Sequence, residues 1–157
     1  MVYLDSDVLI NFLVEQNPQK HKQADGLFSS IARKDALFMS FLVLQEIAFV
    51  LGKLNVPARE IAIKLNELLL LNPYTYGSDE YRRAIFLAQK IGFYNFNDCL
   101  HTAIAETHCA ELITYNKSDF VKIQPLTSLK ISILWLYSQK QMVQLDFTPH
   151  PYKPQIR

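Results

Sequence analysis

Short apolar runs alternate along the chain with longer segments whose apolar residues recur at helical spacing. The short runs predict strands at residues 2–5, 36–39, 73–76, 111–114 and 131–136. Helical spacing predicts helices over residues 6–13, 19–33, 40–53, 57–71, 78–92 and 97–109. Strands that alternate with helices form a parallel sheet covered on both faces. The pattern therefore predicts a three-layer α/β/α fold with a short, mostly parallel sheet of four to five strands.

Local signals mark where these elements begin and end. Ser6 or Asp7 is suited to cap the first helix, and Ser40 to cap the third. Three prolines and few apolar residues follow residue 144, which predicts an extended arm or a disordered tail. We therefore expect one domain over residues 1–136 and a C-terminal extension over residues 137–157.

Composition narrows the classes of function. The chain has 157 residues, half of them hydrophobic, which suits one domain with a sizeable core. Four glycines are too few for a glycine-rich phosphate loop, and a net charge of +1 provides no general attraction for nucleic acid. Cys99 and Cys109 lack the spacing of a metal knuckle and are expected to stay reduced. No apolar stretch is long enough to span a membrane, so we expect a cytoplasmic protein.

Four acidic residues stand in or beside apolar sequence: Asp5, Glu46, Asp98 and Asp119. Asp5 ends the first strand, Asp119 lies in an expected loop after the fourth strand, and Asp98 opens a helix. In a parallel sheet these positions meet at the carboxyl edge, where ligands bind. A carboxylate beside apolar sequence costs free energy unless a partner compensates it, which suggests a divalent metal and metal-assisted hydrolysis.

Each acid also has an ordinary structural explanation. Asp5 could cap the first helix, Asp98 could favour the helix dipole, and Asp119 could be a plain loop acid. Glu46 is harder to explain in this way, because apolar residues surround it over positions 41–51. His101 follows Asp98 by three residues on the same helix face, but no set of nitrogen and sulfur ligands forms a zinc site.

Four segments together resemble the PIN-domain ribonucleases, especially the VapC toxins of toxin–antitoxin pairs. Residues 4–10, LDSDVLI, resemble the opening of that family, and residues 40–51 resemble its helix with a lone Glu. Residues 97–105, NDCLHTAIA, and residues 112–120, LITYNKSDF, are similar to its third and fourth motifs. The resemblance covers residues 1 to about 134 and rests on the order and spacing of the four motifs.

The resemblance implies a metal-dependent endoribonuclease that uses Mg²⁺ or Mn²⁺. It makes Asp5 and Asp98 the expected direct ligands, while Glu46 and Asp119 would be ligands or would orient metal-bound water. Two positions depart from the family pattern. Asp7 stands where Asn or Ser is commoner, and Asn116 stands where some members have Asp.

Neighbouring residues have secondary roles in this interpretation. Asp7 and Asn116 are candidates for hydrogen bonds to the carboxylates, and Lys117 is a candidate phosphate contact. Arg82 and Arg83 could bind an RNA backbone, although a solvated helix face is the simpler interpretation.

The family also implies partners: an RNA substrate, a small antitoxin protein and a second copy of the chain. An antitoxin helix could lie beside the first helices, near Phe12, Leu13 and Phe28, which could equally be core residues.

Two other functions stay open. The pair Asp5-x-Asp7 resembles the nucleophile pair of haloacid-dehalogenase-type phosphatases, although Val8-Leu9 replace the expected Gly-Thr. A catalytically silent PIN-like module that acts by binding is the third hypothesis.

Overall fold

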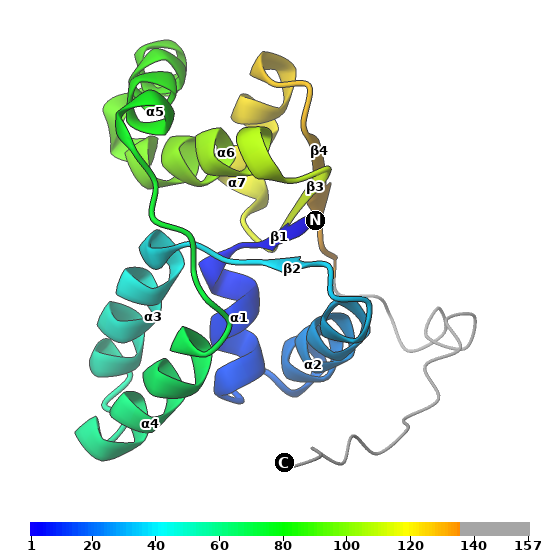
Figure 1. Cartoon of the computed structure of the whole chain (residues 1–157), viewed down its shortest axis with the longest axis vertical. Coiled ribbons are helices and arrows are strands. Elements are labelled where there is room, and N and C mark those ends of the chain that lie inside the picture. Colours follow the sequence, from blue (N-terminus) through cyan, green and yellow to red (C-terminus); the bar gives the residue numbers. More distant parts are fainter. Residues whose placement is uncertain (136–157) are drawn as a thin grey trace.

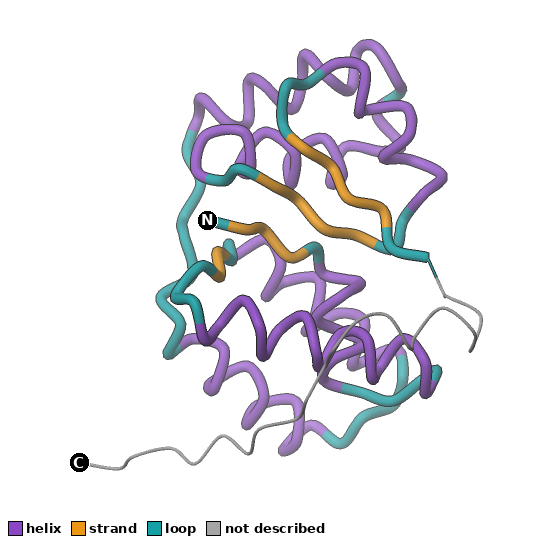
Figure 2. The backbone as a smooth tube through the Cα atoms, turned by 90° about the vertical axis from the view of Figure 1, so that its right-hand side faces the viewer, coloured by secondary structure: helices purple, strands orange, loops and turns teal. Residues whose placement is uncertain are grey.

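A parallel sheet of four strands forms the centre of the molecule, whose computed structural model describes residues 1–135. The strands are β1 (Val2–Leu4), β2 (Leu37–Phe38), β3 (Glu111–Thr114) and β4 (Lys130–Ile133). Their order is β2-β1-β3-β4, so the first strand lies between the second and the third (Figure 2). All three pairings are parallel, as the alternating pattern predicts.

Seven helices cover this sheet within the described residues. On one side lie α1 (Ser6–Leu13), α2 (Pro18–Arg33), α3 (Phe41–Lys53) and α4 (Ala58–Leu69) (Figure 1). On the other side lie α5 (Ser78–Ile91), α6 (Phe96–His108) and α7 (Lys117–Ile123) (Figure 1). Short 3₁₀ turns, Phe93–Asn95 and Gln124–Leu126, precede α6 and follow α7. The result is the expected three-layer α/β/α arrangement.

Capping chemistry explains several helix boundaries. The Asn17 side chain accepts hydrogen bonds from two backbone N–H groups at the start of α2, where Pro18 is the first residue. At α5 the Glu80 carboxylate accepts the Gly77 N–H at 2.9 Å. Gly92 follows α5 with a φ of 102°, a conformation that glycine adopts without a steric penalty.

Three expectations require correction. The cap of α1 is Asp5, not Ser6 or Asp7. The segment expected as a third strand makes only an isolated bridge, between Tyr74 and Ser40. Asp119 lies in the first turn of α7 and not in a loop, because Asn116 caps a short helix that the apolar pattern does not reveal. The last expected strand is β4, which begins one residue earlier and ends at Ile133; residues beyond 135 lie outside the described part.

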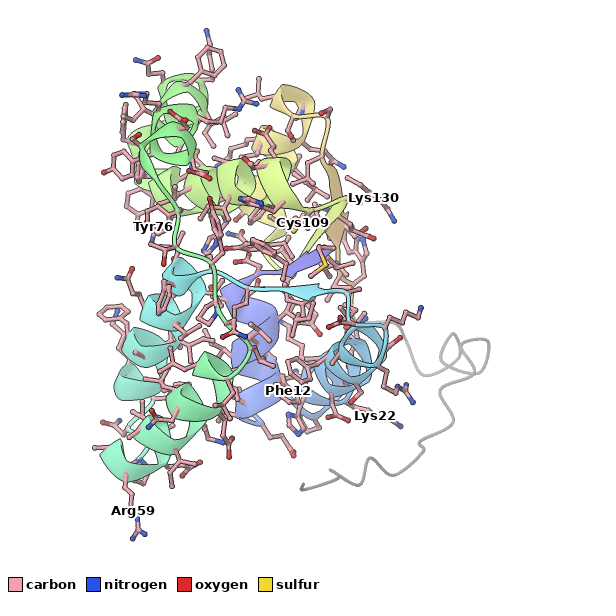
Figure 3. All side chains as sticks on the ribbon, viewed as in Figure 1. Phe12, Lys22, Arg59, Tyr76, Cys109 and Lys130 are labelled. Carbon is pink, nitrogen blue, oxygen red and sulfur yellow. The ribbon has the colours of Figure 1, made fainter. Side chains whose placement is uncertain are left out.

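The core lies on both faces of the two inner strands. Tyr3 and Leu4 of β1 and Leu112 of β3 have no exposed surface. Between the sheet and the surface, Phe12 of α1 stacks on Phe28 of α2 with ring centroids 4.1 Å apart, whereas Arg59 projects from α4 at the periphery (Figure 3).

No helix among residues 1–135 combines the length and the apolar character that a membrane span needs.

Candidate metal centre

Asp5 occupies the carboxyl end of β1, at the centre of the sheet edge. Its side chain is only 4% exposed. One carboxylate oxygen, Oδ1, accepts the Ser6 backbone N–H at 2.7 Å, and the other, Oδ2, accepts the Thr114 hydroxyl at 2.7 Å. Thr114 ends β3, so the two inner strands together fix the orientation of this carboxylate.

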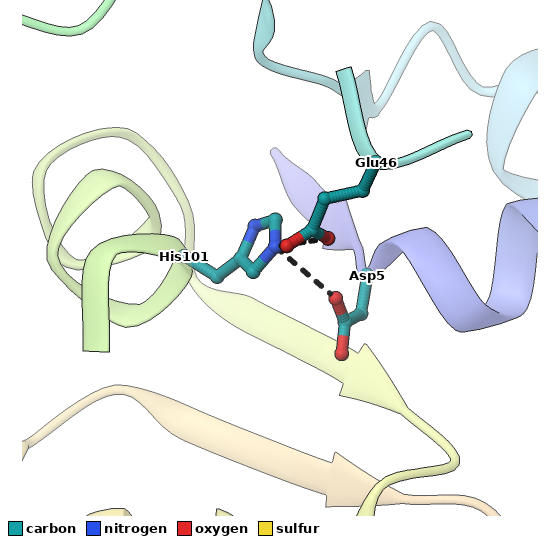
Figure 4. A group of neighbouring side chains, drawn as sticks. All are labelled: Asp5, Glu46 and His101. Atoms are coloured by element: carbon teal, nitrogen blue, oxygen red, sulfur yellow. Dashed lines mark hydrogen bonds and ion pairs between the residues drawn. The ribbon is translucent and has the colours of Figure 1, made fainter. Parts of the chain in front are cut away.

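Glu46 of α3 and His101 of α6 face Asp5 across the sheet edge (Figure 4). The His101 ring nitrogen Nε2 lies 2.8 Å from Glu46 Oε2 and 3.7 Å from Asp5 Oδ1. One potential ligand atom from each of the three residues lies within 4.8 Å of the others. These three side chains come from three different elements, so the fold alone brings them together.

Hydrogen bonds from neighbouring residues fix the Glu46 and His101 side chains. Glu46 Oε2 also accepts the Ser6 hydroxyl at 2.6 Å, and its Oε1 accepts the Asn97 side-chain amide at 2.7 Å. His101 Nδ1 lies 2.7 Å from the Tyr3 hydroxyl, which in turn lies 2.8 Å from the hydroxyl of Ser40. Because a hydroxyl can donate or accept, this chain supports either tautomer of His101.

Asp98 and Asp119 lie further along the same edge. Asp98 is in the first turn of α6, and its carboxylate accepts the Asn116 side-chain amide at 3.4 Å. The same amide nitrogen lies 3.1 Å from Asp119 Oδ2. Asp119 is less dependent on a metal than Asp98, because its other oxygen pairs with the Lys122 ammonium at 3.0 Å.

Asp7 is at this edge too, but its side chain faces the backbone of Tyr115. Its two oxygens lie 3.2 and 3.0 Å from the Tyr115 backbone nitrogen, whose N–H they accept. Burial, together with the charge of Asp5, raises the pKa of Asp7 to about 8. Asp7 therefore links α1 to the end of β3.

The pKa values of Glu46, His101 and Asp98 depend on how burial and neighbouring charges balance at each group. Burial alone would raise the pKa of Glu46, but the hydrogen bond and charge of His101 outweigh it and hold this pKa at about 2. Burial alone would lower the pKa of His101, but Asp5 and Glu46 raise it to about 9. Asp98 has no hydrogen bond to this cation: burial and the charge of Asp5 raise its pKa to about 7, although the charge of His101 acts in the opposite direction.

The donor set fits a divalent cation. Asp5 and Glu46 can each offer an oxygen to one ion of this kind, whereas His101, whose pKa both carboxylates raise, would hold Glu46 in place. A cation there would also compensate the buried charge that raises the pKa of Asp98. Carboxylate oxygens suit Mg²⁺ or Mn²⁺.

The structure adds one residue to the predicted set and separates others from it. His101 was not expected in the cluster, although its spacing of three residues from Asp98 was a sequence signal that both face one way. Arg83 binds both oxygens of Glu106, each at 2.8 Å, and therefore joins α5 to α6. Lys117 lies 4.1 Å from the centroid of the Trp135 ring.

An α/β/α sandwich with acids gathered at the carboxyl edge of a parallel sheet defines the class of protein. Residues 2–124 match the model of the PIN domain family, and the chain belongs to this family. PIN domains are typically metal-dependent nucleases.

Solved structures include a relative of the same fold. The chain is similar to a chain in the crystal structure of VapBC2 from Rickettsia felis bound to a DNA fragment from their promoter, with a TM-score of 0.57 and 18% identity. The match covers 86% of this chain and 99% of the other. At this identity the likeness concerns the fold. No curated protein matches the sequence significantly.

Proposed function

We propose that the protein is a metal-dependent endoribonuclease and the toxin of a toxin–antitoxin pair. The observation that supports the proposal most directly is the group of Asp5, Glu46 and His101 from three elements at one sheet edge, with Asp98 outside this group but influenced by the charges of Asp5 and Glu46. The family supports a nuclease, and Asp98 lacks the direct hydrogen bond to His101 that Glu46 makes. Mg²⁺ or Mn²⁺ is the proposed cofactor, held by Asp5, Glu46 and Asp98, with Asp119 at its outer side.

The residues of the site have distinct tasks in this reaction. A bound divalent ion lowers the pKa of coordinated water and offsets the charge of the phosphate. Asp5 is held by two donors and presents a fixed carboxylate, while Ser6, Asn97 and His101 orient Glu46. Asn116 keeps Asp98 and Asp119 close together at one end of the site.

The phosphatase hypothesis has less support. It requires Asp7 to reach the leaving group as an acid, whereas both Asp7 oxygens face the Tyr115 backbone N–H. A covalent phosphate on Asp5 after incubation with a phosphate ester would restore it. The silent-module hypothesis requires a site that does not bind metal.

Calorimetric titration with Mn²⁺, combined with an RNA cleavage assay, tests the nuclease. The wild type is expected to bind Mn²⁺ and to cleave RNA only with the metal present, and Asp5→Asn to lose most of both. The matched control is Asp79→Asn, which removes an exposed carboxylate at the start of α5. Equal Mn²⁺ affinity in Asp5→Asn and the wild type would exclude Asp5 as a ligand.

A small antitoxin is the proposed partner, in the cytoplasm where RNA is available. The acidic edge attracts a cation, so an Arg or Lys of the partner would pair with Asp5 and Asp98 in place of the metal. A partner helix would lie beside Phe12, Leu13 and Phe28, which are half-buried and pack against the core.

Co-expression with the small reading frame adjacent to the gene, followed by co-purification and the cleavage assay, tests this partner. A bound neighbour that leaves cleavage unchanged would refute the toxin assignment.

Self-association is the second proposed interaction. Apolar side chains remain exposed at the end of α4 and just beyond it, with Leu70 80% exposed and Leu71 45% exposed. Exposed apolar surface of this kind marks interfaces, and a two-fold pair is the commonest symmetry.

A further inference from the structure

Two aromatic rings lie at the carboxyl edge of the sheet, next to the acids, and each is paired with a lysine. Lys20 Nζ lies 4.8 Å from the Tyr115 ring centroid, and Lys117 Nζ lies 4.1 Å from the Trp135 ring centroid. We call these four residues the edge strip. None of them is part of the metal centre described above.

Hydrogen bonds tie the edge strip to the metal centre. The Tyr115 N–H bonds Asp7, and the Leu134 N–H donates to the Thr114 carbonyl at 2.8 Å, directly before Trp135. Thr114 is the residue whose hydroxyl binds Asp5. Trp135 therefore follows directly after Leu134, whose N–H bonds Thr114, and the Thr114 hydroxyl bonds Asp5.

Gln23 of α2 holds the two aromatic residues side by side. Its Oε1 accepts the Tyr115 hydroxyl at 3.0 Å, and its Nε2 donates to the Trp135 carbonyl at 3.4 Å. Trp135 remains 53% exposed although the Lys117 ammonium lies over its ring. A large apolar ring is thus held open to solvent beside a cation.

The charges explain what such a strip is suited to bind. The acids at the sheet edge repel phosphates, whereas Lys20 and Lys117 carry the opposite charge beside them. Aromatic rings next to cations bind unpaired nucleotides, because the ring stacks on a base while the ammonium contacts the backbone. A base inside a duplex already has both faces covered by its neighbours.

We infer that the edge strip is a subsite for a single-stranded nucleotide, stacked on Trp135 with its phosphate at Lys117. The inference rests on the proposed ribonuclease and assigns Trp135 and Lys117 as residues that hold its RNA strand beside the metal centre. An RNA strand in the metal centre would then leave it across the ends of β3 and β4.

Trp135 is the only tryptophan in the chain, so its fluorescence reports on this ring directly. The full chain is titrated in EDTA at low ionic strength, where metal-dependent cleavage cannot proceed, with a single-stranded oligoribonucleotide of about ten nucleotides. We expect saturable quenching. An abasic oligomer of equal length and a perfect RNA duplex are expected to quench little at the same concentration.

Variants are compared by the fluorescence anisotropy of labelled RNA. Trp135→Ala is expected to bind about 5- to 150-fold more weakly, and Trp135→Phe to stay close to the wild type, because one stacked base contributes about that range. Lys117→Gln is expected to reduce the slope of log affinity against log salt by about 0.7, the value for one phosphate contact. The matched control is Phe86→Ala, which removes an exposed ring beside Arg83 and Lys90 on α5.

Three results would overturn the subsite: quenching by the abasic oligomer equal to that by RNA, undiminished RNA binding by Trp135→Ala, or fluorescence that follows protein concentration because a second copy covers the ring. The nuclease proposal can be judged separately. Quenching without any Mn²⁺-dependent cleavage refutes the nuclease alone, and cleavage without quenching refutes the subsite alone.

Discussion

Asp98→Asn tests the electrostatics of the site without any assumption about the substrate. The substitution removes a carboxyl group whose pKa rises from its ordinary value of 3.8 to about 7, through burial and the charge of Asp5. A pKa shift of one unit corresponds to about 1.4 kcal/mol, so a shift from 3.8 to about 7 makes the ionised group cost the folded state at most about 4.5 kcal/mol. Because side chains and water relax around the charge, we expect a measured value on the order of 2 kcal/mol.

The sign of the pH dependence follows from proton binding. Between pH 3.8 and about 7 the folded protein holds a proton on Asp98 that the unfolded chain has released. The contribution of Asp98 to the stability of the metal-free wild type should therefore fall as pH rises through this window and level off above it. Asp98→Asn should be more stable than the wild type at about pH 8, and the difference should vanish at about pH 4.

Urea unfolding in EDTA at several pH values measures this effect. Asp79→Asn is the control, because its carboxylate is exposed on α5 and its loss should change stability by no more than about 0.5 kcal/mol. Mn²⁺ should raise the melting temperature of the wild type more than that of Asp98→Asn, since the ion compensates the same charge. An Asp98→Asn protein that is destabilised equally at both ends of the pH range would refute the reasoning.

Three further predictions concern Glu46, Arg83 and the oligomeric state. Glu46→Gln should abolish Mn²⁺-dependent RNA cleavage while leaving the circular dichroism spectrum unchanged; undiminished cleavage would exclude Glu46 from the reaction. Arg83→Ala should lower the free energy of unfolding by about 2–3 kcal/mol, because it leaves the partly buried Glu106 carboxylate without its cation. The exposed pair of Arg82 should be worth less than about 1 kcal/mol in the same urea assay, and equal losses would contradict this argument. Sedimentation at micromolar concentration should show a species larger than the 18.2 kDa chain, and a purely monomeric protein would disprove self-association.

Much of the fold follows from local sequence. The apolar runs of β1 and β3 are short and bounded by polar residues, and two helices between them begin at local capping groups, the Asn17 side chain at α2 and the Glu80 carboxylate at α5. These signals act within a few residues, so they can be recognised without knowledge of the rest of the chain. The parallel sheet, the three layers and the position of Asp5 directly after β1 are consequences of that alternation.

Tertiary structure decided what depends on residues far apart in the chain. His101 joined Glu46 only because α6 and α3, on opposite sides of the sheet, both reach its carboxyl edge (Figure 1), which places the His101 ring nitrogen 2.8 Å from Glu46. Arg83 became a structural ion pair because α5 packs on α6 at Glu106. Trp135 and Lys117 came together because β3 and β4 end side by side. Local sequence sets which elements form, but side-chain partners depend on packing between elements, and burial then sets the charge that each group carries.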